Sequence, residues 1–292
     1  MIIGTRGSRL ALWQANHIKD QLAENGIEAE LKIIKTQGDK IQHLGFDKLE
    51  GKGFFTKELE EALLTDQIDI AVHSLKDLPT EGVEGLSLAA LSERADPADV
   101  LLIRQDAIDQ DKPYRLKARA KVGTSSVRRQ AQLLEFHPEL EMVNIRGNVP
   151  TRVNKAKTGE VDAVALAAAG LDRLELDTSE FLRIRLSPRE FIPAPAQGVM
   201  ALQVKTDNMD LRRQLIALHH VAVGECTNVE RKVLNLLEGG CQLPLGVYCD
   251  KDQLGHYHVS AALGMEHGVV RTRVSQSTRA GLAEEVLKRL GI

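Results

Sequence analysis

Two stretches of the chain share one order of apolar and polar positions. Each begins with a short apolar strand and a Gly-Thr turn, Ile2–Thr5 in the first and Val122–Thr124 in the second, and each turn opens an amphipathic helix. Further on, each stretch has a buried strand, Ile68–Val72 or Val161–Leu166, and a loop with charged side chains. The repeat predicts two α/β lobes of similar construction, and a chance likeness between buried strands is the alternative.

The first helix of each lobe has recognisable ends. In the first lobe, apolar residues recur at helical spacing from Ala11 to Leu22, Ser8 is expected as the N-cap, and Asn25-Gly26 ends the helix. Alternation from Ile27 to Ile33 then predicts a strand. In the second lobe the corresponding helix ends at His137-Pro138. A strand that leads through a glycine loop into a helix directs backbone N–H groups at one point, which suits an anion.

Two proline-bearing segments predict how the lobes are connected. They lie at residues 94–97 and 192–198, and they imply that the chain leaves the first lobe, builds the second and returns through a strand at Ala201–Val204. Paired connections of this kind act as a hinge. Residues 38–53 are polar, contain several glycines and are long for a connection, which indicates a functional or a mobile loop.

The C-terminal part has a different pattern. A helix from about residue 221 is followed by the loop of Cys241, by three strand-like segments and by a closing helix over Gly281–Leu290. This order predicts a small α+β domain with a three-stranded antiparallel sheet. The expected division gives residues 1–96 and 198–217 to domain 1, 97–197 to domain 2 and 218–292 to domain 3.

Composition narrows the class of protein. The 292 residues suffice for two or three domains, and 43% apolar with 27% charged residues is typical of a globular protein. The net charge of −3 argues against general nucleic-acid binding. No apolar run approaches the ~20 residues of a membrane helix, and Met1–Arg6 has no export signal, so we expect a cytoplasmic protein. Three cysteines without metal-ligand spacing make a disulfide framework unexpected.

Five arginines of the second lobe occupy expected loops and helix starts. A guanidinium group pairs bidentately with carboxylates and phosphates. Each one taken singly is better explained as a solvated surface residue, but together they indicate a ligand with several negative charges. They are Arg128, Arg129, Arg146, Arg152 and Arg173, and Arg6 occupies the matching loop of the first lobe.

Two further residues are candidates for chemistry. Asp77 follows a buried strand at the sheet edge where ligands collect, and its carboxylate could stabilise a cation and move protons. A turn-forming aspartate before Leu78-Pro79 is the alternative. Cys241 follows two glycines that leave its thiol uncrowded, and a small buried residue in a turn is the alternative. We expect His73 to be a packed histidine, and His219-His220 lacks a partner at metal-ligand spacing, so no metal site is expected.

Seven motifs, spread in order over nearly the whole chain, resemble those of the porphobilinogen deaminase (hydroxymethylbilane synthase) family. Any one of them could arise by chance, but the whole series is very specific. The motifs are Gly4–Gln14, Gly51–Glu58, His73–Pro79, Gly123–Gln130, Ile145–Val149, Ala169–Leu174 and Leu237–Cys241.

The resemblance implies a fold, a cofactor and a reaction. The fold would consist of two periplasmic-binding-protein-like lobes joined by a two-strand hinge, with the small α+β domain after them. The cofactor would be a dipyrromethane, made from two substrate molecules and attached as a thioether to Cys241. The enzyme would join four porphobilinogens head to tail and release an ammonia at each step. Its product, hydroxymethylbilane, would be cut from the cofactor by water and passed to uroporphyrinogen-III synthase. A monomer with no nucleic-acid or membrane partner is expected.

The resemblance also implies roles for individual residues. Asp77 would assist the departing amine and stabilise the cationic azafulvene that results. Residues 38–53 would form a flexible lid, and Cys226 and Cys249, which match no attachment motif, are assigned to structure. The residues that match cofactor- or substrate-binding positions are Arg6, Ser8, Lys52, Ser74, Lys76, Thr124, Ser126, Arg128, Arg129, Arg146, Arg152, Arg173, Gln197 and Gly198.

Two segments depart from the family pattern. Pro150 stands where many relatives have glycine or another small residue, and Pro195-Ala196-Gln197 replaces a more usual Val-Gly-Gln. Neither change removes a charged group, so both bear on the local backbone more than on the activity.

Two other functions fit parts of the sequence. A bilobed anion-binding or sensor protein would need neither Asp77 nor a thiol. RNA binding through Arg128-Arg129 would have only 3% aromatic residues for base stacking. The mass of the intact chain separates these functions, because an excess of two pyrrole units is expected of the enzyme alone.

Overall fold

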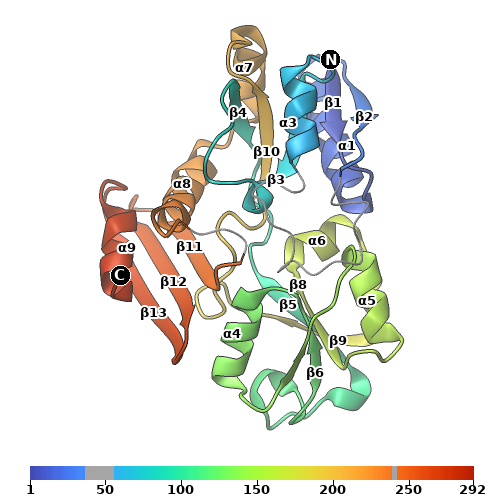
Figure 1. The fold of residues 1–292 in the computed structure, drawn as a ribbon, viewed down its shortest axis with the longest axis vertical. Coiled ribbons are helices and arrows are strands. Elements are labelled where there is room, and N and C mark those ends of the chain that lie inside the picture. The colour runs from blue at the N-terminus through green and yellow to red at the C-terminus, as the bar shows by residue number, and fades with distance from the viewer. Residues whose placement is uncertain (37–55, 239–241) are drawn as a thin grey trace. The chain divides into compact units, whose positions relative to one another are not determined.

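The computed structural model of the chain describes residues 1–36, 56–238 and 242–292. They form two compact units, Met1–Ala95 with Gly198–Glu225 and Asp96–Gln197 with Cys226–Ile292. The chain therefore enters the second unit after Ala95, returns to the first after Gln197 and enters the second again within a long helix. Figure 1 labels the elements of both units.

The first unit is built on a five-stranded sheet. The strand order is β2 (Glu30–Ile33), β1 (Ile2–Thr5), β3 (Ile70–Ser74), β10 (Met200–Lys205) and β4 (Leu86–Leu91). Strand β1 is parallel to β2 and β3, whereas β10 is antiparallel to β3 and β4. The strand expected from Ile27 begins only at Glu30, because the Ile27 N–H donates to the Leu22 carbonyl at the end of the preceding helix (2.9 Å).

Helices cover both faces of this sheet. They are α1 (Arg9–Glu24), α3 (Lys57–Leu64) and α7 (Met209–Leu215). Ile70 and Val72 of β3 belong to one core cluster with Ile18 of α1, whereas Ala71 belongs to another with Leu63 of α3. Successive residues of a strand point to opposite faces, so α1 and α3 lie on opposite faces of the sheet.

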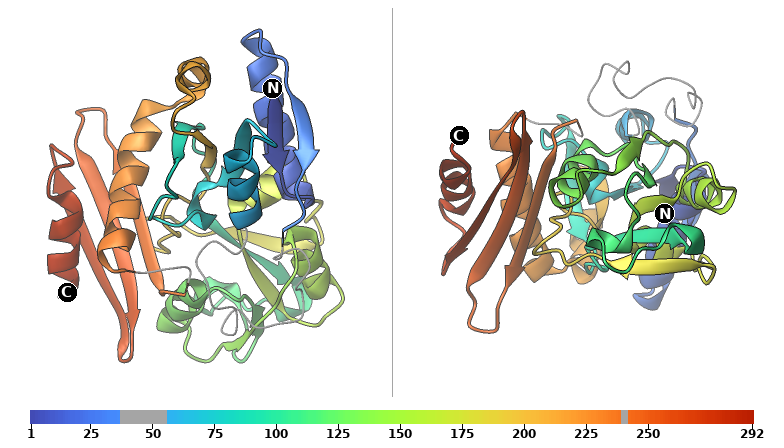
Figure 2. Two further views of the ribbon diagram at one scale, coloured as in Figure 1. Left: turned by 45° about the horizontal axis from the view of Figure 1, so that its top comes forward. Right: turned by 90° about the horizontal axis from the view of Figure 1, so that it is seen from below.

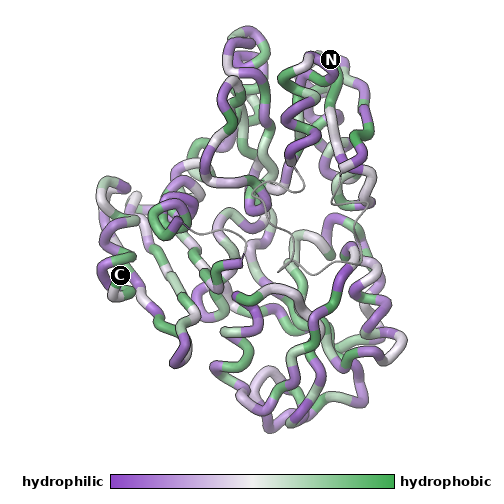
Figure 3. Tube along the Cα trace, viewed as in Figure 1, coloured by the Kyte–Doolittle hydropathy of each residue, from purple (hydrophilic) through white to green (hydrophobic). Residues whose placement is uncertain are grey.

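The second unit repeats this topology. Its five-stranded sheet has the order β7 (Glu141–Val143), β6 (Lys121–Gly123), β8 (Ala163–Ala167), β5 (Asp99–Arg104) and β9 (Phe181–Arg185). Strand β6 is parallel to β7 and β8, and β5 is antiparallel to β8 and β9. Its helices are α4 (Val127–Phe136), α5 (Val149–Lys157) and α6 (Ala168–Arg173). Figure 3 colours the chain by the hydropathy of its residues.

The repeat extends to single contacts. Asp69 precedes β3 and its Oδ2 accepts from the Ile2 N–H (2.7 Å), while Asp162 precedes β8 and its Oδ2 accepts from the Lys121 N–H (2.8 Å). Each aspartate thus joins two neighbouring parallel strands in the same way, β1 with β3 in the first unit and β6 with β8 in the second. The two predicted α/β lobes are therefore confirmed as copies of one construction.

Glycines in β1 and β6 permit the same close packing. A Cβ atom on Gly4 would lie 2.2 Å from Cδ1 of Ile68, and one on Gly123 would lie 2.7 Å from Cδ1 of Ile145. Real Cβ atoms do not approach so closely, so a side chain at either position would make the neighbouring isoleucine shift, and glycine lets it pack directly against the strand.

The C-terminal part of the second unit contains a separate sheet, as predicted. Its antiparallel strands are β11 (Leu245–Lys251), β12 (Tyr257–Met265) and β13 (Gly268–Gln276), and the helices beside it are α8 (Val221–Leu236) and α9 (Leu282–Leu290) (Figure 2). Val247 and Val259 share a core with Val233 of α8 and Val286 of α9. Gly246 points to the other face, where a Cβ would lie 2.4 Å from the Ile192 carbonyl oxygen.

Candidate functional site

A short turn after β3 presents Asp77. Leu75 is fully buried and its N–H donates to the Val199 carbonyl (2.9 Å), and Leu78 is buried behind it. With both leucines inside, the 3₁₀ turn Leu75–Asp77 leaves Lys76 half-buried and Asp77 exposed. The Asp77 carboxylate makes no hydrogen bond or ion pair with any residue in the described part of the chain. Its backbone is therefore fixed, and none of the described residues occupies its carboxylate oxygens.

The turn after β1 lies at the same sheet edge, since β1 and β3 are parallel neighbours. Ser8 is the N-cap of α1, as predicted, and its Oγ accepts from the Ala11 N–H (3.3 Å). Gln14 is buried and donates its amide to Ser74 Oγ (2.9 Å), which ties α1 to the end of β3. Sequence reasoning missed Gln14 because its place on the buried face of a helix gives no chemical signal. Arg6 is half-buried in the same turn.

His73 is confirmed as a packed histidine. It is 6% exposed, and its Nε2 lies 3.0 Å from the Gln203 side-chain oxygen. Burial is the main cause that lowers the pKa of His73 from 6.5 to about 4, so the ring is neutral at physiological pH. A neutral ring inside the sheet does not serve as the cation or surface base of this edge.

The corresponding turn of the second unit uses its hydroxyls to shape the backbone. Thr124 is fully buried, and its Oγ1 accepts from the Ser126 N–H (3.2 Å). Ser126 is the N-cap of α4, and its Oγ accepts from the Arg129 N–H (3.4 Å). These contacts start α4 directly after the turn and so fix where its first arginines lie.

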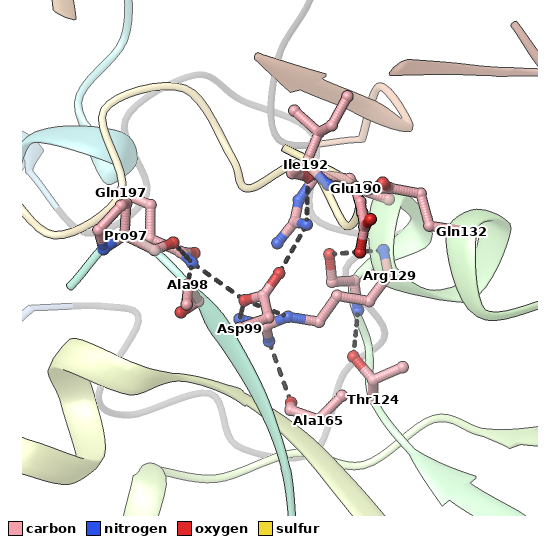
Figure 4. A network of polar contacts seen from close by, with 12 residues as sticks. Pro97, Ala98, Asp99, Thr124, Arg129, Gln132, Ala165, Glu190, Ile192 and Gln197 are labelled. Atoms are coloured by element: carbon pink, nitrogen blue, oxygen red, sulfur yellow. Dashed lines mark hydrogen bonds and ion pairs between the residues drawn. The ribbon is translucent and has the colours of Figure 1, made fainter. Parts of the chain in front are cut away.

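Arg128 and Arg129 lie inside the unit, not on its surface. They are 4% and 6% exposed, and both pair with the fully buried Asp99, Arg128 through Nη1 to Oδ2 (2.7 Å) and Arg129 through Nη2 to Oδ1 (2.7 Å). Figure 4 shows Asp99 at the centre of this network. Burial raises the pKa of Asp99, but the two guanidinium groups outweigh it and hold that pKa far below its usual value. The network carries one more positive than negative charge.

Other residues of the second unit complete the network. Gln197 donates from Nε2 to Asp99 Oδ1 (3.0 Å) and to the Pro97 carbonyl (2.8 Å), so the two connecting segments of the chain are bonded to each other (Figure 4). Gln132 exchanges two hydrogen bonds with the backbone of Ile192 (2.8 and 2.9 Å). Asp99 and Gln132 were not among the expected site residues, because both lie in stretches that read as ordinary core.

The remaining expected arginines are half-buried. Arg146 lies just before α5, Arg152 lies in the first part of α5 and donates from Nε to the Gly147 carbonyl (2.8 Å), and Arg173 is the last residue of α6. Arg152 thus lies at a helix start, as expected, whereas the position of Arg173 at the end of α6 departs from the expectation of loops and helix starts. Burial lowers the pKa of Arg173 to about 10, so its guanidinium is charged but poorly hydrated. Pro150 occupies the first turn of α5, where proline fits because no helical partner is lost.

The segment Pro195-Ala196-Gln197 has a strained backbone. Ala196 is fully buried with φ = 63°, a left-handed conformation that glycine adopts more easily, and its N–H donates to Glu230 Oε2 (2.6 Å). Gly198 has φ = 93° and packs against the Ala95 carbonyl. The departure from the family pattern at Ala196 therefore affects the local backbone conformation, as expected.

The cysteines divide into two groups. Cys226 and Cys249 are buried, and a hydrogen bond with Cys226 together with burial raises the pKa of the Cys249 thiol, which fits a structural role. Cys241, Lys52 and the expected lid over residues 38–53 lie outside the described residues. Within the described ranges, no cluster of three or more histidine, cysteine, aspartate or glutamate side chains could hold a metal ion. None of the helices in these ranges has the length and apolar character of a membrane span.

Comparison with known proteins covers nearly the whole chain. Residues 1–213 match the family model described as porphobilinogen deaminase, dipyromethane cofactor binding domain, and residues 225–290 match the porphobilinogen deaminase C-terminal domain. The porphobilinogen deaminase of Geotalea daltonii is 46% identical over 84% of this chain and 76% of its own length. That of Chloroherpeton thalassium is 40% identical over 100% of this chain and 91% of its own length.

The chain also has a distant likeness to solved structures. An arginine-specific periplasmic binding protein of Salmonella typhimurium matches with 14% identity and a TM-score of 0.41 over 75% of this chain and 90% of its own. So low a score adds nothing to the description of the fold. The two family models and the curated relatives decide the matter, and the chain belongs to the porphobilinogen deaminase family.

Proposed function

We propose that this chain joins four porphobilinogens head to tail into hydroxymethylbilane, with Asp77 as the catalytic residue. Porphobilinogen deaminase, or hydroxymethylbilane synthase, is a transferase of tetrapyrrole and haem biosynthesis, and this chain has its cofactor-binding domain. The observation that carries the proposal is the exposed carboxylate of Asp77, which pairs with none of the described residues and stands on a turn fixed by Leu75 and Leu78. An anion-binding protein without catalysis, the alternative, is not favoured by the family match.

Asp77 acts on charge at the reacting carbon. Positive charge develops on the methylene carbon of porphobilinogen as its amine departs, and a carboxylate nearby stabilises that charge. The same carboxylate can accept the proton released when the new carbon–carbon bond has formed. Because Asp77 makes no ion pair with the described residues, no cation among them has to be displaced before it meets the substrate.

The residues present fit the family's cofactor. A dipyrromethane bound as a thioether to Cys241 supplies the pyrrole carbon on which the chain is extended, and each of its rings carries an acetate and a propionate. The surplus positive charge of the Asp99 network and the poorly hydrated guanidinium of Arg173 suit such carboxylates. The residues proposed to hold cofactor and substrate are Arg6, Ser8, Lys52, Ser74, Lys76, Thr124, Ser126, Arg128, Arg129, Arg146, Arg152, Arg173, Gln197 and Gly198.

We propose three domains for the chain. Residues 1–96 with 198–217 form domain 1 with the catalytic turn, 97–197 form domain 2 with most of the arginines, and 218–292 form domain 3 with the attachment cysteine. We propose a cytoplasmic monomer whose product is taken up by uroporphyrinogen-III synthase.

The mass of the intact purified chain tests the function. We expect an excess over the sequence mass equal to two pyrrole units, and we expect Cys241→Ser to lose it. Cys249→Ala is the matched control, since it removes a buried thiol that has no attachment motif, and it should keep the excess. A wild-type chain at its plain sequence mass that makes no hydroxymethylbilane would contradict the proposal.

A further inference from the structure

Asp99 stands at a junction that the family resemblance does not assign. It is the first residue of β5, it is fully buried, and side chains from two other segments converge on it. Arg128 and Arg129 reach it from the start of α4, and Gln197 reaches it from the second connecting segment. Figure 4 labels Arg129 and Gln197 around Asp99. A carboxylate in such a position sets the orientation of every group bonded to it.

The two arginines use their donors differently. Arg129 donates from Nε and Nη2 to Asp99 (3.1 and 2.7 Å) and from Nη1 to the Ala165 carbonyl (3.1 Å), so all three of its nitrogens are engaged. Arg128 engages only Nη1, which pairs with Asp99 (2.7 Å) and donates to the Ile192 carbonyl (2.8 Å). Its Nε and Nη2 donate to none of the described residues.

An aromatic ring also lies beside the guanidinium group of Arg128. Its guanidinium carbon lies 6.0 Å from the centre of the Phe191 ring. Nη1 of the group is therefore tied to Asp99 and Ile192, its carbon lies over an aromatic ring, and its remaining N–H groups donate to none of the described residues. A guanidinium held at one end in this way is prepared to receive a carboxylate at the other.

We infer that Asp99 is a positioning residue that holds the guanidinium groups of Arg128 and Arg129 in place. It orients Arg128 so that Nε and Nη2 of Arg128 receive a carboxylate of the cofactor or substrate. The inference rests on the proposed carboxylate-binding role of Arg128. Arg129 has a structural role in this arrangement, because all three of its side-chain nitrogens already donate to Asp99 or to the Ala165 carbonyl. Gln197 adds a further donor to Asp99 and so links this arrangement to the connecting segment.

Replacement of Asp99 by asparagine tests the inference. Asp99→Asn keeps the size of the side chain and removes the charge that holds both guanidinium groups. We expect folded protein with a smaller fraction of chains carrying the two-pyrrole mass excess, and a KM for porphobilinogen raised about 10-fold or more in the loaded fraction, with little change in kcat. Asp99→Glu, which retains the charge, should recover part of the loading. Asp106→Asn is the control, because Asp106 pairs with Arg104 on the surface of the same unit, and it should load and bind normally.

The outcomes separate the inference from the function. A folded Asp99→Asn chain with wild-type loading and KM overturns the role of Asp99 and leaves the function standing. Failure of both Asp99 variants to fold also overturns it, because Asp99 then serves stability alone. A wild-type chain without the mass excess removes the proposed function first, and the inference with it.

Discussion

The Nε2 atom of His73 and the side-chain oxygen of Gln203 lie 3.0 Å apart in the interior of the first unit. Gln203 in turn donates to Glu60 Oε1 (3.2 Å), and Thr56 donates to Glu60 Oε2 (3.2 Å). All four side chains are buried. This series of contacts joins β3, which leads to Asp77, to β10 and to the start of α3.

The state of His73 should make stability depend on pH. Burial lowers its pKa from 6.5 to about 4, the hydrogen bond with Gln203 opposes that shift, and Arg6 adds to it. The unfolded chain therefore binds this proton at a higher pH than the folded chain. The stabilisation is complete above pH 6.5 and is lost as the pH falls toward 4, by on the order of 3 kcal/mol for the full shift.

Urea unfolding of the wild type and of His73→Gln across this pH range measures the effect. Because glutamine does not titrate, the stability difference between the two proteins should shrink steadily as the pH falls from 6.5 to 4. A difference that stays constant across the range would show that the buried imidazole is not the titrating group.

Loss of the Asp77 carboxylate should affect turnover and not the fold. Asp77 is exposed and has no partner among the described residues, so Asp77→Ala should change the free energy of unfolding by less than about 0.5 kcal/mol. Formation of hydroxymethylbilane should fall by roughly 10² or more, the usual contribution of a positioned acid or base. Asp20→Ala, on the exposed side of α1, is a matched control and should keep its activity. Turnover near the wild-type rate in Asp77→Ala would refute the assignment.

The connecting segment should tolerate no side chain at Gly198. Its φ is +93°, and a Cβ there would lie 2.6 Å from the Ala95 carbonyl oxygen, which is backbone and cannot move aside like a flexible side chain. We expect Gly198→Ala to lower the free energy of unfolding by roughly 1–3 kcal/mol. Gly82→Ala is the control, because a Cβ there meets nothing within 4 Å, and equal stabilities of the two variants in denaturant unfolding would rule out the strain.

The contact between α1 and β3 should contribute measurably to stability. Gln14→Leu keeps the buried volume but removes the 2.9 Å bond to Ser74, and we expect a loss of about 1 kcal/mol. Asn16→Ala removes an exposed amide that donates within α1 and should cost less. Calorimetric melting of the two variants compares them, and a Gln14→Leu protein as stable as the wild type would mean that water replaces the bond.

Much of the fold followed from local patterns. The repeated strand, Gly-Thr turn and helix predicted both lobes because short-range patterning and capping decide these elements, and the N-cap at Ser8 was placed correctly. The start of β2 was misplaced because the Ile27 N–H is taken by the end of α1, a contact that alternation does not reveal.

The candidate site was predictable in its residue types but not in its arrangement. Clustered arginines suggested a polyanion, yet nothing in the run Asp99–Arg104 shows that its first residue is the buried counter-ion of Arg128 and Arg129. That pairing joins segments about thirty residues apart and depends on how β5 enters the sheet beside β8. Gln14 escaped for a similar reason, since its partner Ser74 lies sixty residues away.

The matching hydrogen bonds of Asp69 and Asp162 identify these two aspartates as equivalent positions of the two units. Counted forward from these two anchors, the position of Asp77 in one unit is that of Gly170 in the other. One unit thus carries an acid where the other has no side chain at all. The duplicated architecture provides no spare for Asp77, and damage to that single turn has no substitute at the equivalent position.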